Sequence, residues 1–135
     1  MGSVGKEIGV RGPAITFDTG AIIALERRKE RAMKIYTHAR DRGFVVATPN
    51  VTLAEWWRAR SDRRELLLKG LLVEPPTDDV VKLAGVALGK VPGATTIDAI
   101  VAAFAVQRTG IVYTSDVGDF ETLRVFFPAL RVFAV

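Results

Sequence analysis

Five short apolar runs divide this sequence, with longer stretches of helix-forming residues between them. The runs occupy residues 14–17, 44–48, 71–74, 111–114 and 131–134. Because apolar and polar residues do not alternate along them, they are typical of strands that are buried on both faces. Parallel strands need long crossover connections, and helices usually supply these. The sequence therefore predicts an α/β fold with a central, mostly parallel five-stranded sheet.

The segments between these runs carry helix start and stop signals. We expect helices over about 20–26, 30–41, 52–59, 62–69, 78–88, 96–106 and 118–126. In the fifth of these, seven apolar positions are expected to face the core: Val80, Val81, Leu83, Ala84, Val86, Ala87 and Leu88. The sixth is apolar almost all round, so we expect it to be buried across the sheet.

Length and composition indicate one globular domain. The chain has 135 residues, of which 49% are hydrophobic and 25% are charged. We assign residues 14–135 to this domain and residues 1–13, which are rich in glycine, to a flexible N-terminal arm or an expression remnant. No apolar run approaches the roughly 20 residues of a membrane helix, and the N-terminus lacks an apolar signal-peptide region. A cytoplasmic location without membrane association is the expectation.

Metal chemistry is restricted by the absence of cysteine and by a single histidine, His38. Thiolate sites are excluded, and a zinc site or a histidine-dependent triad is disfavoured. A metal ion would be held by oxygen ligands, which favours Mg²⁺ or Mn²⁺. Charge is also uneven, because residues 1–70 hold 14 of the 19 basic side chains but only 8 of the 15 acidic ones. This suits a polyanion-binding face beside a cation pocket, but on charge alone solvated helix faces are the favoured explanation.

Carboxylates recur where the expected strands end and helices begin. Asp18 follows the first strand and Asp116 the fourth, while Glu55 and Asp98 lie in the first turns of helices. Asp119 comes one turn after Asp116. In open parallel sheets the functional crevice lies beyond the carboxyl ends of strands, where connections diverge to opposite edges. If the first and fourth strands flank this point, Asp18 and Asp116 would lie side by side and could share one cation.

Helix capping explains each acid separately. Asp18 and Asp116 fit the N-cap position, and both Glu55 and Asp98 stand three residues after a threonine, as in a capping box. Taken together, however, carboxylates near buried surface repel one another unless they are protonated or bridged by a metal. No lysine or arginine is adjacent in sequence to Asp18, Asp98 or Asp116, so a divalent cation is the expected counter-charge.

This arrangement resembles the PIN-domain ribonucleases. The likeness runs from about residue 15 to 135 and is carried by FDT at 17–19, LAE at 53–55, IDA at 97–99, and TSD at 114–116 with DF at 119–120. Within this family, these motifs are most similar to those of the VapC-type toxins of bacterial toxin–antitoxin pairs. The resemblance implies a three-layer α/β/α fold, a Mg²⁺ or Mn²⁺ pocket, endonucleolytic cleavage of RNA, a homodimer and inhibition by a cognate antitoxin.

Carried over by position, the resemblance implies four catalytic acids, namely Asp18, Glu55, Asp98 and Asp116. Asp119 matches a less constant fifth position, and either Thr114 or Ser115 matches a supporting hydroxyl. Thr19 is expected to form a hydrogen bond within its turn.

The chemistry of phosphodiester hydrolysis assigns roles to these acids. Asp18 and Asp116 are the expected direct metal ligands, with Asp98 either sharing the ion or holding its water shell. Glu55 would orient or deprotonate the attacking water, or help to hold a second ion. Basic side chains then extend the site. Arg58 could stabilise the phosphate, although a surface role is the simpler one, and five arginines could contact RNA phosphates: Arg27, Arg28, Arg60, Arg63 and Arg64.

Other interpretations remain open at this stage. The domain could be a degenerate module that binds metal or RNA without cleavage, or a PIN nuclease that is not a toxin. A flavodoxin-like phosphoacceptor would also collect acids at strand ends, but it would need a lysine after a late strand, and none follows Lys90.

Overall fold

A computed structural model of the chain describes residues 12–135. Its five strands are β1 (Ala14–Phe17), β2 (Val45–Pro49), β3 (Leu72–Glu74), β4 (Ile111–Thr114) and β5 (Arg131–Ala134). They form one sheet in the order β3-β2-β1-β4-β5, and every pairing is parallel. The predicted five-stranded parallel sheet is therefore confirmed.

The connections between the strands are helical. They contain α2 (Thr19–Glu26), α3 (Glu30–Asp41), the 3-10 turn η1 (Asn50–Thr52), α4 (Leu53–Trp56), α5 (Asp62–Lys69), α6 (Asp78–Lys90), α7 (Thr96–Val106) and α8 (Val117–Leu123). Several begin at the cap residues that the sequence indicated, because Ser61, Thr77 and Thr95 each accept a hydrogen bond from a backbone N–H in the first turn. None of the helices within residues 12–135 has the length and hydrophobicity required to span a membrane.

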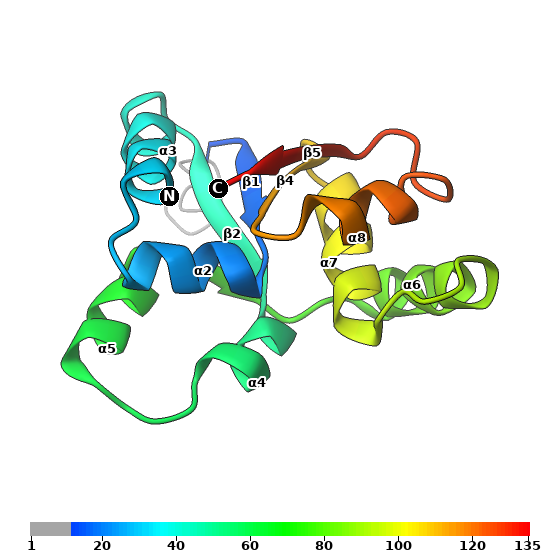
Figure 1. Cartoon of the computed structure of the whole chain (residues 1–135), viewed down its shortest axis with the longest axis horizontal. Helices are drawn as coiled ribbons and strands as arrows, with labels where there is room; N and C mark the ends of the chain where they lie inside the picture. Colours follow the sequence, from blue (N-terminus) through cyan, green and yellow to red (C-terminus); the bar gives the residue numbers. More distant parts are fainter. Residues whose placement is uncertain (1–11) are drawn as a thin grey trace, which may run out of the picture.

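Helices cover both faces of the sheet, which gives three layers (Figure 1). On one face α2, α3 and the buried ring of Trp56 pack over Ile15, Phe17 and Val46. On the other face α6, α7 and α8 pack over Ala47 and Val112. The α7 helix is buried along 99–105, as its apolar sequence predicted. The structure therefore has the expected three-layer α/β/α architecture.

Several helices differ from the sequence prediction, and one of them, α8, ends at Leu123 rather than near residue 126. The helix expected over 52–59 is shorter, since α4 ends at Trp56 and Trp57 leaves helical geometry with ψ of 73°. Val81 and Val86 were expected in the core but are 44% and 51% exposed. A helix turns 100° for each residue, so seven apolar positions in nine residues cannot all face one way. Their contribution to the core was therefore predicted wrongly.

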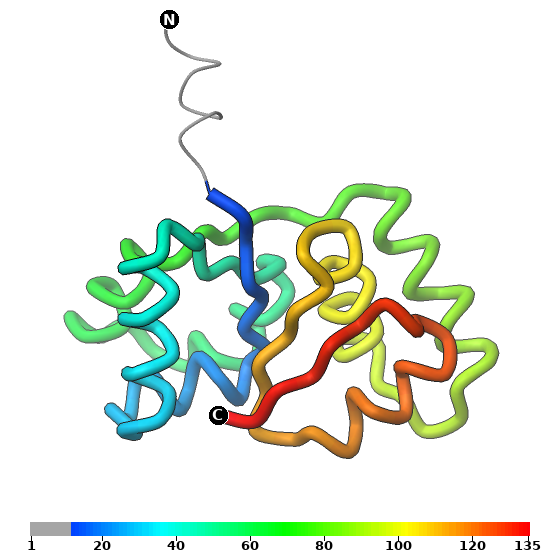
Figure 2. The backbone as a smooth tube through the Cα atoms, turned by 90° about the horizontal axis from the view of Figure 1, so that it is seen from above, coloured from blue at the N-terminus to red at the C-terminus, as the bar shows by residue number. Residues whose placement is uncertain are grey.

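Successive strands are added on one side of β1 and then on the other. From β1 the chain moves outward to β2 and β3, and then returns through α6 and α7 to β4 on the opposite side of β1 (Figure 2). The switch point predicted between the first and fourth strands is thus present, and Asp18 lies at it. The expected arm over residues 1–13 falls mostly outside the described residues. Of its last two positions, Pro13 accepts a hydrogen bond from Val45 N at 2.8 Å.

Candidate active site

Asp18 is the most buried acid of the candidate site. Its backbone N–H donates to Tyr113 O at 3.2 Å, which fixes it at the carboxyl end of β1 beside β4. The side chain is 7% exposed. One carboxylate oxygen, Oδ1, accepts from Ala21 N at 2.8 Å and caps α2, while Oδ2 accepts from Thr114 Oγ1 at 2.6 Å. Asp18 therefore caps a helix and also presents its carboxylate to the switch point.

Thr114 connects Asp18 to Asp116. Its buried hydroxyl donates to Asp18 and at the same time accepts from Asp116 N at 2.8 Å. Asp116 is exposed and begins α8, where its Oδ1 accepts a long hydrogen bond of 3.4 Å from Asp119 N. Ser115 is exposed and lies against Gly20. Of the two hydroxyls left open by the sequence, Thr114 is the one that contacts the buried acid.

Glu55 reaches the same region from α4. Its side chain is exposed, and Oε1 accepts a 2.6 Å hydrogen bond from Thr19 Oγ1 at the start of α2. The sequence suggested a turn contact for Thr19, whereas the structure gives it a partner 36 residues away. Thr52 does not cap α4; its hydroxyl donates to Pro49 O instead. Glu55 is therefore held by a side chain adjacent to Asp18.

Asp98 approaches from the opposite layer of the fold. It lies half-buried in the first turn of α7, where its backbone N–H donates to Thr95 Oγ1 at 3.1 Å. The capping function predicted for this Thr-x-x-Asp segment is thus present. The carboxylate of Asp98 interacts electrostatically with Glu55, Asp116 and Asp119. Capping and clustering therefore coexist at this position.

The pKa values show how closely these acids influence one another. Burial raises the pKa of Asp18 from 3.8 to about 6, although the hydrogen bonds from Thr114 and Ala21 oppose this, and the charges of Asp98 and Glu55 add to it. Burial also raises the pKa of Asp98, with further contributions from neighbouring carboxylates. Contact with the carboxylate of Asp116 raises the pKa of the exposed Asp119. In each of these three acids the ionised form is therefore disfavoured, by burial at Asp18 and Asp98 and by contact with Asp116 at Asp119.

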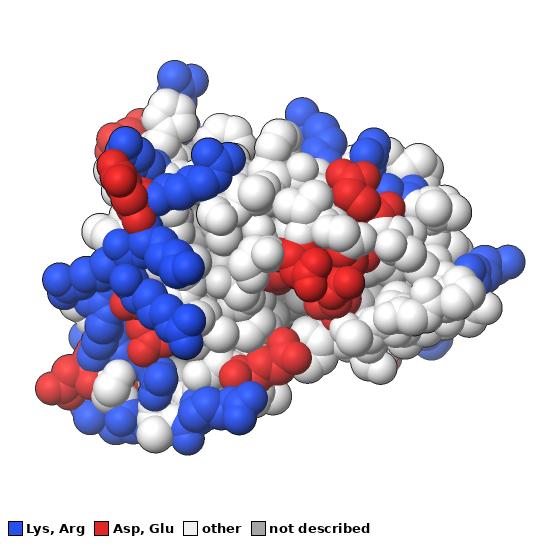
Figure 3. Space-filling model, in the orientation of Figure 1, with Lys and Arg blue, Asp and Glu red and all other residues white. Residues whose placement is uncertain are grey.

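No basic side chain compensates this charge within residues 12–135. None of the ion pairs there involves Asp18, Glu55, Asp98, Asp116 or Asp119. Figure 3 shows acidic side chains gathered near the centre of one face, whereas basic side chains gather at its side over α3 and α5. A divalent cation suits such a site chemically, since all of the ligands offered are oxygen atoms.

The geometry adds a restriction to this metal assignment. No three His, Cys, Asp or Glu side chains among the described residues already form a group that could hold a metal ion. Asp18 and Asp116 share the hydroxyl of Thr114, but the acids that raise the pKa of Asp18 are Asp98 and Glu55. The donor set fits Mg²⁺ or Mn²⁺ by charge and chemistry, and cation binding would have to draw the carboxylates together.

The arginines predicted to contact RNA separate into two groups. Arg27 and Arg28 are exposed in the turn after α2, and within the described chain their side chains have no hydrogen bond or ion pair. The other three are engaged: Arg60 pairs with Asp62 and Glu65, Arg63 donates to Glu26 O, and Arg64 pairs with Glu26. Arg58 is exposed, and its Nε donates to Glu55 O at 2.9 Å.

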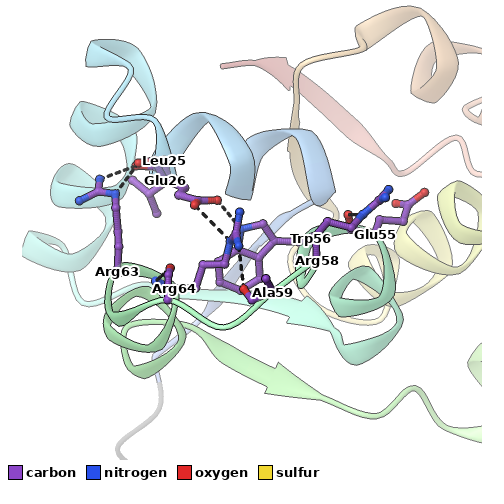
Figure 4. Close-up of polar contacts among 9 residues, drawn as sticks. Leu25, Glu26, Glu55, Trp56, Arg58, Ala59, Arg63 and Arg64 are labelled. Carbon is purple, nitrogen blue, oxygen red and sulfur yellow. Dashed lines mark hydrogen bonds and ion pairs between the residues drawn. The ribbon is translucent and has the colours of Figure 1, made fainter.

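A buried contact behind Glu55 was not anticipated from the sequence. Trp56 is only 2% exposed, and its Nε1 donates to Glu26 Oε1 at 2.8 Å (Figure 4). Glu26 lies in the charged run 26–31 that ends α2, where an acid is usually solvated. Glu26 is seven residues after Thr19 and so lies on the same face of α2. This spacing is the one feature of the sequence that could have suggested a contact between Glu26 and α4.

Comparison with known proteins supports the architecture. No protein-family model and no curated protein matches the sequence. The VapBC2 complex from Rickettsia felis, bound to a DNA fragment from their promoter, contains a similar fold with a TM-score of 0.74 and 11% identity. That match covers 90% of this chain and 98% of the other. FitAB bound to an IR36 DNA fragment gives a TM-score of 0.64 and 21% identity over 89% and 94% of the two chains.

Proposed function

We propose that this chain is a divalent-metal-dependent endoribonuclease of the PIN type. The observation that carries the proposal is the electrostatic clustering of acids from four separate elements near the switch point of the sheet. Asp18, Glu55, Asp98 and Asp116 follow β1 or β4 or lie on α4 or α7, and they have no basic partner within the described chain. If these acids served only as helix caps, they would not need to lie near one another.

The chain's own residues would divide the work of hydrolysis. Asp18, Asp98 and Asp116 would hold Mg²⁺ or Mn²⁺, which when bound supplies a Lewis acid that polarises the phosphate and activates water. Thr114 would keep Asp18 and Asp116 in register. Glu55, the exposed acid of the group, would accept the proton of the attacking water.

Substrate binding would use the basic edge of the face that carries these acids. Arg27 and Arg28 are exposed and unengaged within the described chain, so they are the better candidates for contacts to RNA phosphates. Arg58 would need to rotate away from Glu55 O to reach a phosphate, which would break a 2.9 Å hydrogen bond. Arg60, Arg63 and Arg64 serve internal contacts in the first instance.

The biological role we propose is that of the toxin in a toxin–antitoxin pair. Proteins of similar fold include VapBC2 and FitAB, both described as bound to DNA fragments. By analogy this chain would form a homodimer in the cytoplasm and be inhibited by a cognate antitoxin. A small neighbouring gene encoding a DNA-binding partner would support this role, and a lone gene would favour a PIN nuclease that is not a toxin.

The proposed activity is tested by degradation of an RNA panel with and without Mn²⁺. The wild type should cleave only with the metal, while Asp18→Asn and Asp98→Asn should each lower the rate by at least about 100-fold. Calorimetric titration with Mn²⁺ provides a second readout, because both variants should bind the ion more weakly. The double-stranded DNA of the same sequences serves as the control substrate.

Two results would contradict the proposal. Cleavage that survives both substitutions would mean that the acids at the switch point do not form the active site. Mn²⁺ binding by the wild type without cleavage of any RNA would favour the alternative of a degenerate binding module.

A further inference from the structure

The short helix that carries Glu55 also carries Trp56, whose large side chain is buried. The α4 helix has only four residues, so its own backbone hydrogen bonds cannot hold it rigidly. Trp56 is among the largest fully buried side chains described, and it packs with α2 and β1 in the core. Because Glu55 is adjacent to Trp56, the placement of the indole ring determines where the carboxylate emerges.

Glu26 holds that indole ring from the end of α2. Its Oε1 accepts from Trp56 Nε1 at 2.8 Å, while its Oε2 lies 3.2 Å from Arg64 Nε. The side chains of Glu26 and Arg64 are only 19% and 23% exposed, so this ion pair is partly shielded from water. The guanidinium of Arg64 also donates to Ala59 O at 2.7 Å, which ties down the linker after α4 (Figure 4).

A neighbouring arginine secures Glu26 itself. Arg63 donates to the last carbonyls of α2, with Nε at 2.5 Å from Glu26 O and a second nitrogen at 3.5 Å from Leu25 O. Leu25 O also accepts from Arg28 N at 3.0 Å, and a cation at a helix C-terminus interacts favourably with the helix dipole. Together these contacts join α2, α4 and α5 around one carboxylate.

The α2 helix therefore contacts α4 at both of its ends. At the N-terminal end Thr19 donates to Glu55, and seven residues later Glu26 accepts from Trp56. Seven helical residues span about 10 Å, so the two contacts are well separated. Asp18 caps the same helix through Ala21 N. The relative position of Asp18 and Glu55 is thus set by one rigid element rather than by a loop.

We propose that Glu26 is a positioning residue which, through the buried Trp56, holds the Glu55 carboxylate in place relative to Asp18. This inference rests on the proposed function, because it assumes that Glu55 acts in RNA cleavage. A purely structural role would predict loss of stability alone. A positioning role predicts that kcat falls in every variant that loses the hydrogen bond from Trp56 to residue 26, and not in variants that keep it.

The test compares three variants by RNA cleavage with Mn²⁺. Glu26→Ala removes the acceptor, and Trp56→Phe removes the donor but keeps a buried ring. Each should lower kcat about 10-fold with KM unchanged, and the double variant should be no slower than either single one. Glu26→Gln keeps an oxygen acceptor for the indole but removes the charge beside Arg64, so it should retain most of the wild-type kcat.

A matched control replaces an acid whose exposed ion pair involves none of Glu26, Trp56 and Arg64. Glu30 forms an exposed pair with Lys34 at 3.1 Å on α3, and Glu30→Gln should leave kcat unchanged. All variants are compared at a temperature at which circular dichroism shows them fully folded. Glu26→Ala with wild-type kcat, or Glu26→Gln as slow as Glu26→Ala, would overturn the proposal.

A measurement that needs no activity separates this inference from the proposed function. The ¹³C chemical shift of the Glu55 side-chain carboxyl reports its hydrogen bond from Thr19, and Thr19→Val gives the reference value for its loss. Glu26→Ala should move the Glu55 signal towards that reference, whereas Glu26→Gln should not. If the wild type cleaves no RNA, a moved signal still supports positioning by Glu26, and an unmoved signal overturns it.

Discussion

Replacing Asp18 with asparagine should stabilise the folded protein at neutral pH when no divalent cation is present. The pKa of Asp18 is raised from 3.8 to about 6, chiefly by burial. The folded state therefore binds more protons than the unfolded state between these values, and stability falls as the pH rises through this window. Above about pH 6 the wild type carries the full cost of an ionised, buried carboxylate, whereas asparagine has no charge to bury.

The size of the effect follows from that difference in pKa. At about 1.4 kcal/mol for each tenfold change in proton affinity, the difference from 3.8 to about 6 corresponds to about 3 kcal/mol. This is an upper limit, because the amide must replace the oxygen that accepts from Thr114. The hydroxyl of Thr114 can reverse its role and accept from the amide. We therefore expect a net gain of about 1 to 3 kcal/mol at pH 7.5.

Urea denaturation at two pH values tests this reasoning. The free energy of unfolding of Asp18→Asn should exceed that of the wild type at pH 7.5, and the advantage should disappear near pH 3.5, below both pKa values. Asp41→Asn, at an exposed acid on α3, should stay within about 0.5 kcal/mol of the wild type at both pH values. An Asp18→Asn variant that is destabilised equally at both pH values would refute the electrostatic argument and leave helix capping as the role of this acid.

Two further pairs of substitutions test the geometry around the site. Thr114→Val removes the hydroxyl shared by two acids and should cost about 1 to 3 kcal/mol in chemical denaturation, whereas Ser115→Ala, at an exposed neighbour, should cost less than about 0.5 kcal/mol. Gly110→Ala, before β4, should lower the melting temperature more than Gly43→Ala. Both glycines have φ of +81°, but a Cβ at Gly110 would lie 2.9 Å from Ala129 O, while at Gly43 nothing lies within 4 Å. Equal melting temperatures for the last two variants would contradict the proposed clash.

The sequence predicted the fold well because the central strands β1 and β2 are largely buried on both faces, although the edge strand β5 is mostly exposed, which the sequence did not predict. Runs such as AITF at 14–17 and IVYT at 111–114 contain no alternation, and this pattern has few solutions other than a covered parallel sheet. The structure reproduces both runs as β1 and β4. Prediction failed where burial depended on tertiary contacts, as on α6, where Val81 and Val86 face solvent although their neighbours are buried.

The positions of the acids in the candidate site could be predicted from the sequence, but the hydrogen bonds that connect them to other elements could not. Topology alone brings Asp18 and Asp116 to one edge of the sheet, since both follow adjacent strands. The contact between Thr19 and Glu55 joins residues 36 positions apart, and it depends on how α4 packs against α2. No periodicity in the sequence encodes that packing. The same is true of Glu26, whose charged neighbours 27–31 suggested a solvated helix end.

Helix capping and metal binding are compatible at Asp18, because they use different lone pairs of the same carboxylate. Each oxygen accepts one hydrogen bond, from Ala21 N or from Thr114 Oγ1, and retains a second lone pair for a cation. These two bonds lower the pKa of Asp18, yet burial and neighbouring charge raise it further than they lower it. The folded protein therefore keeps an acid whose ionised form is incompletely stabilised by its own contacts. A bound divalent cation would supply the missing stabilisation, and a protein that needed only a helix cap could have used serine or asparagine without that cost.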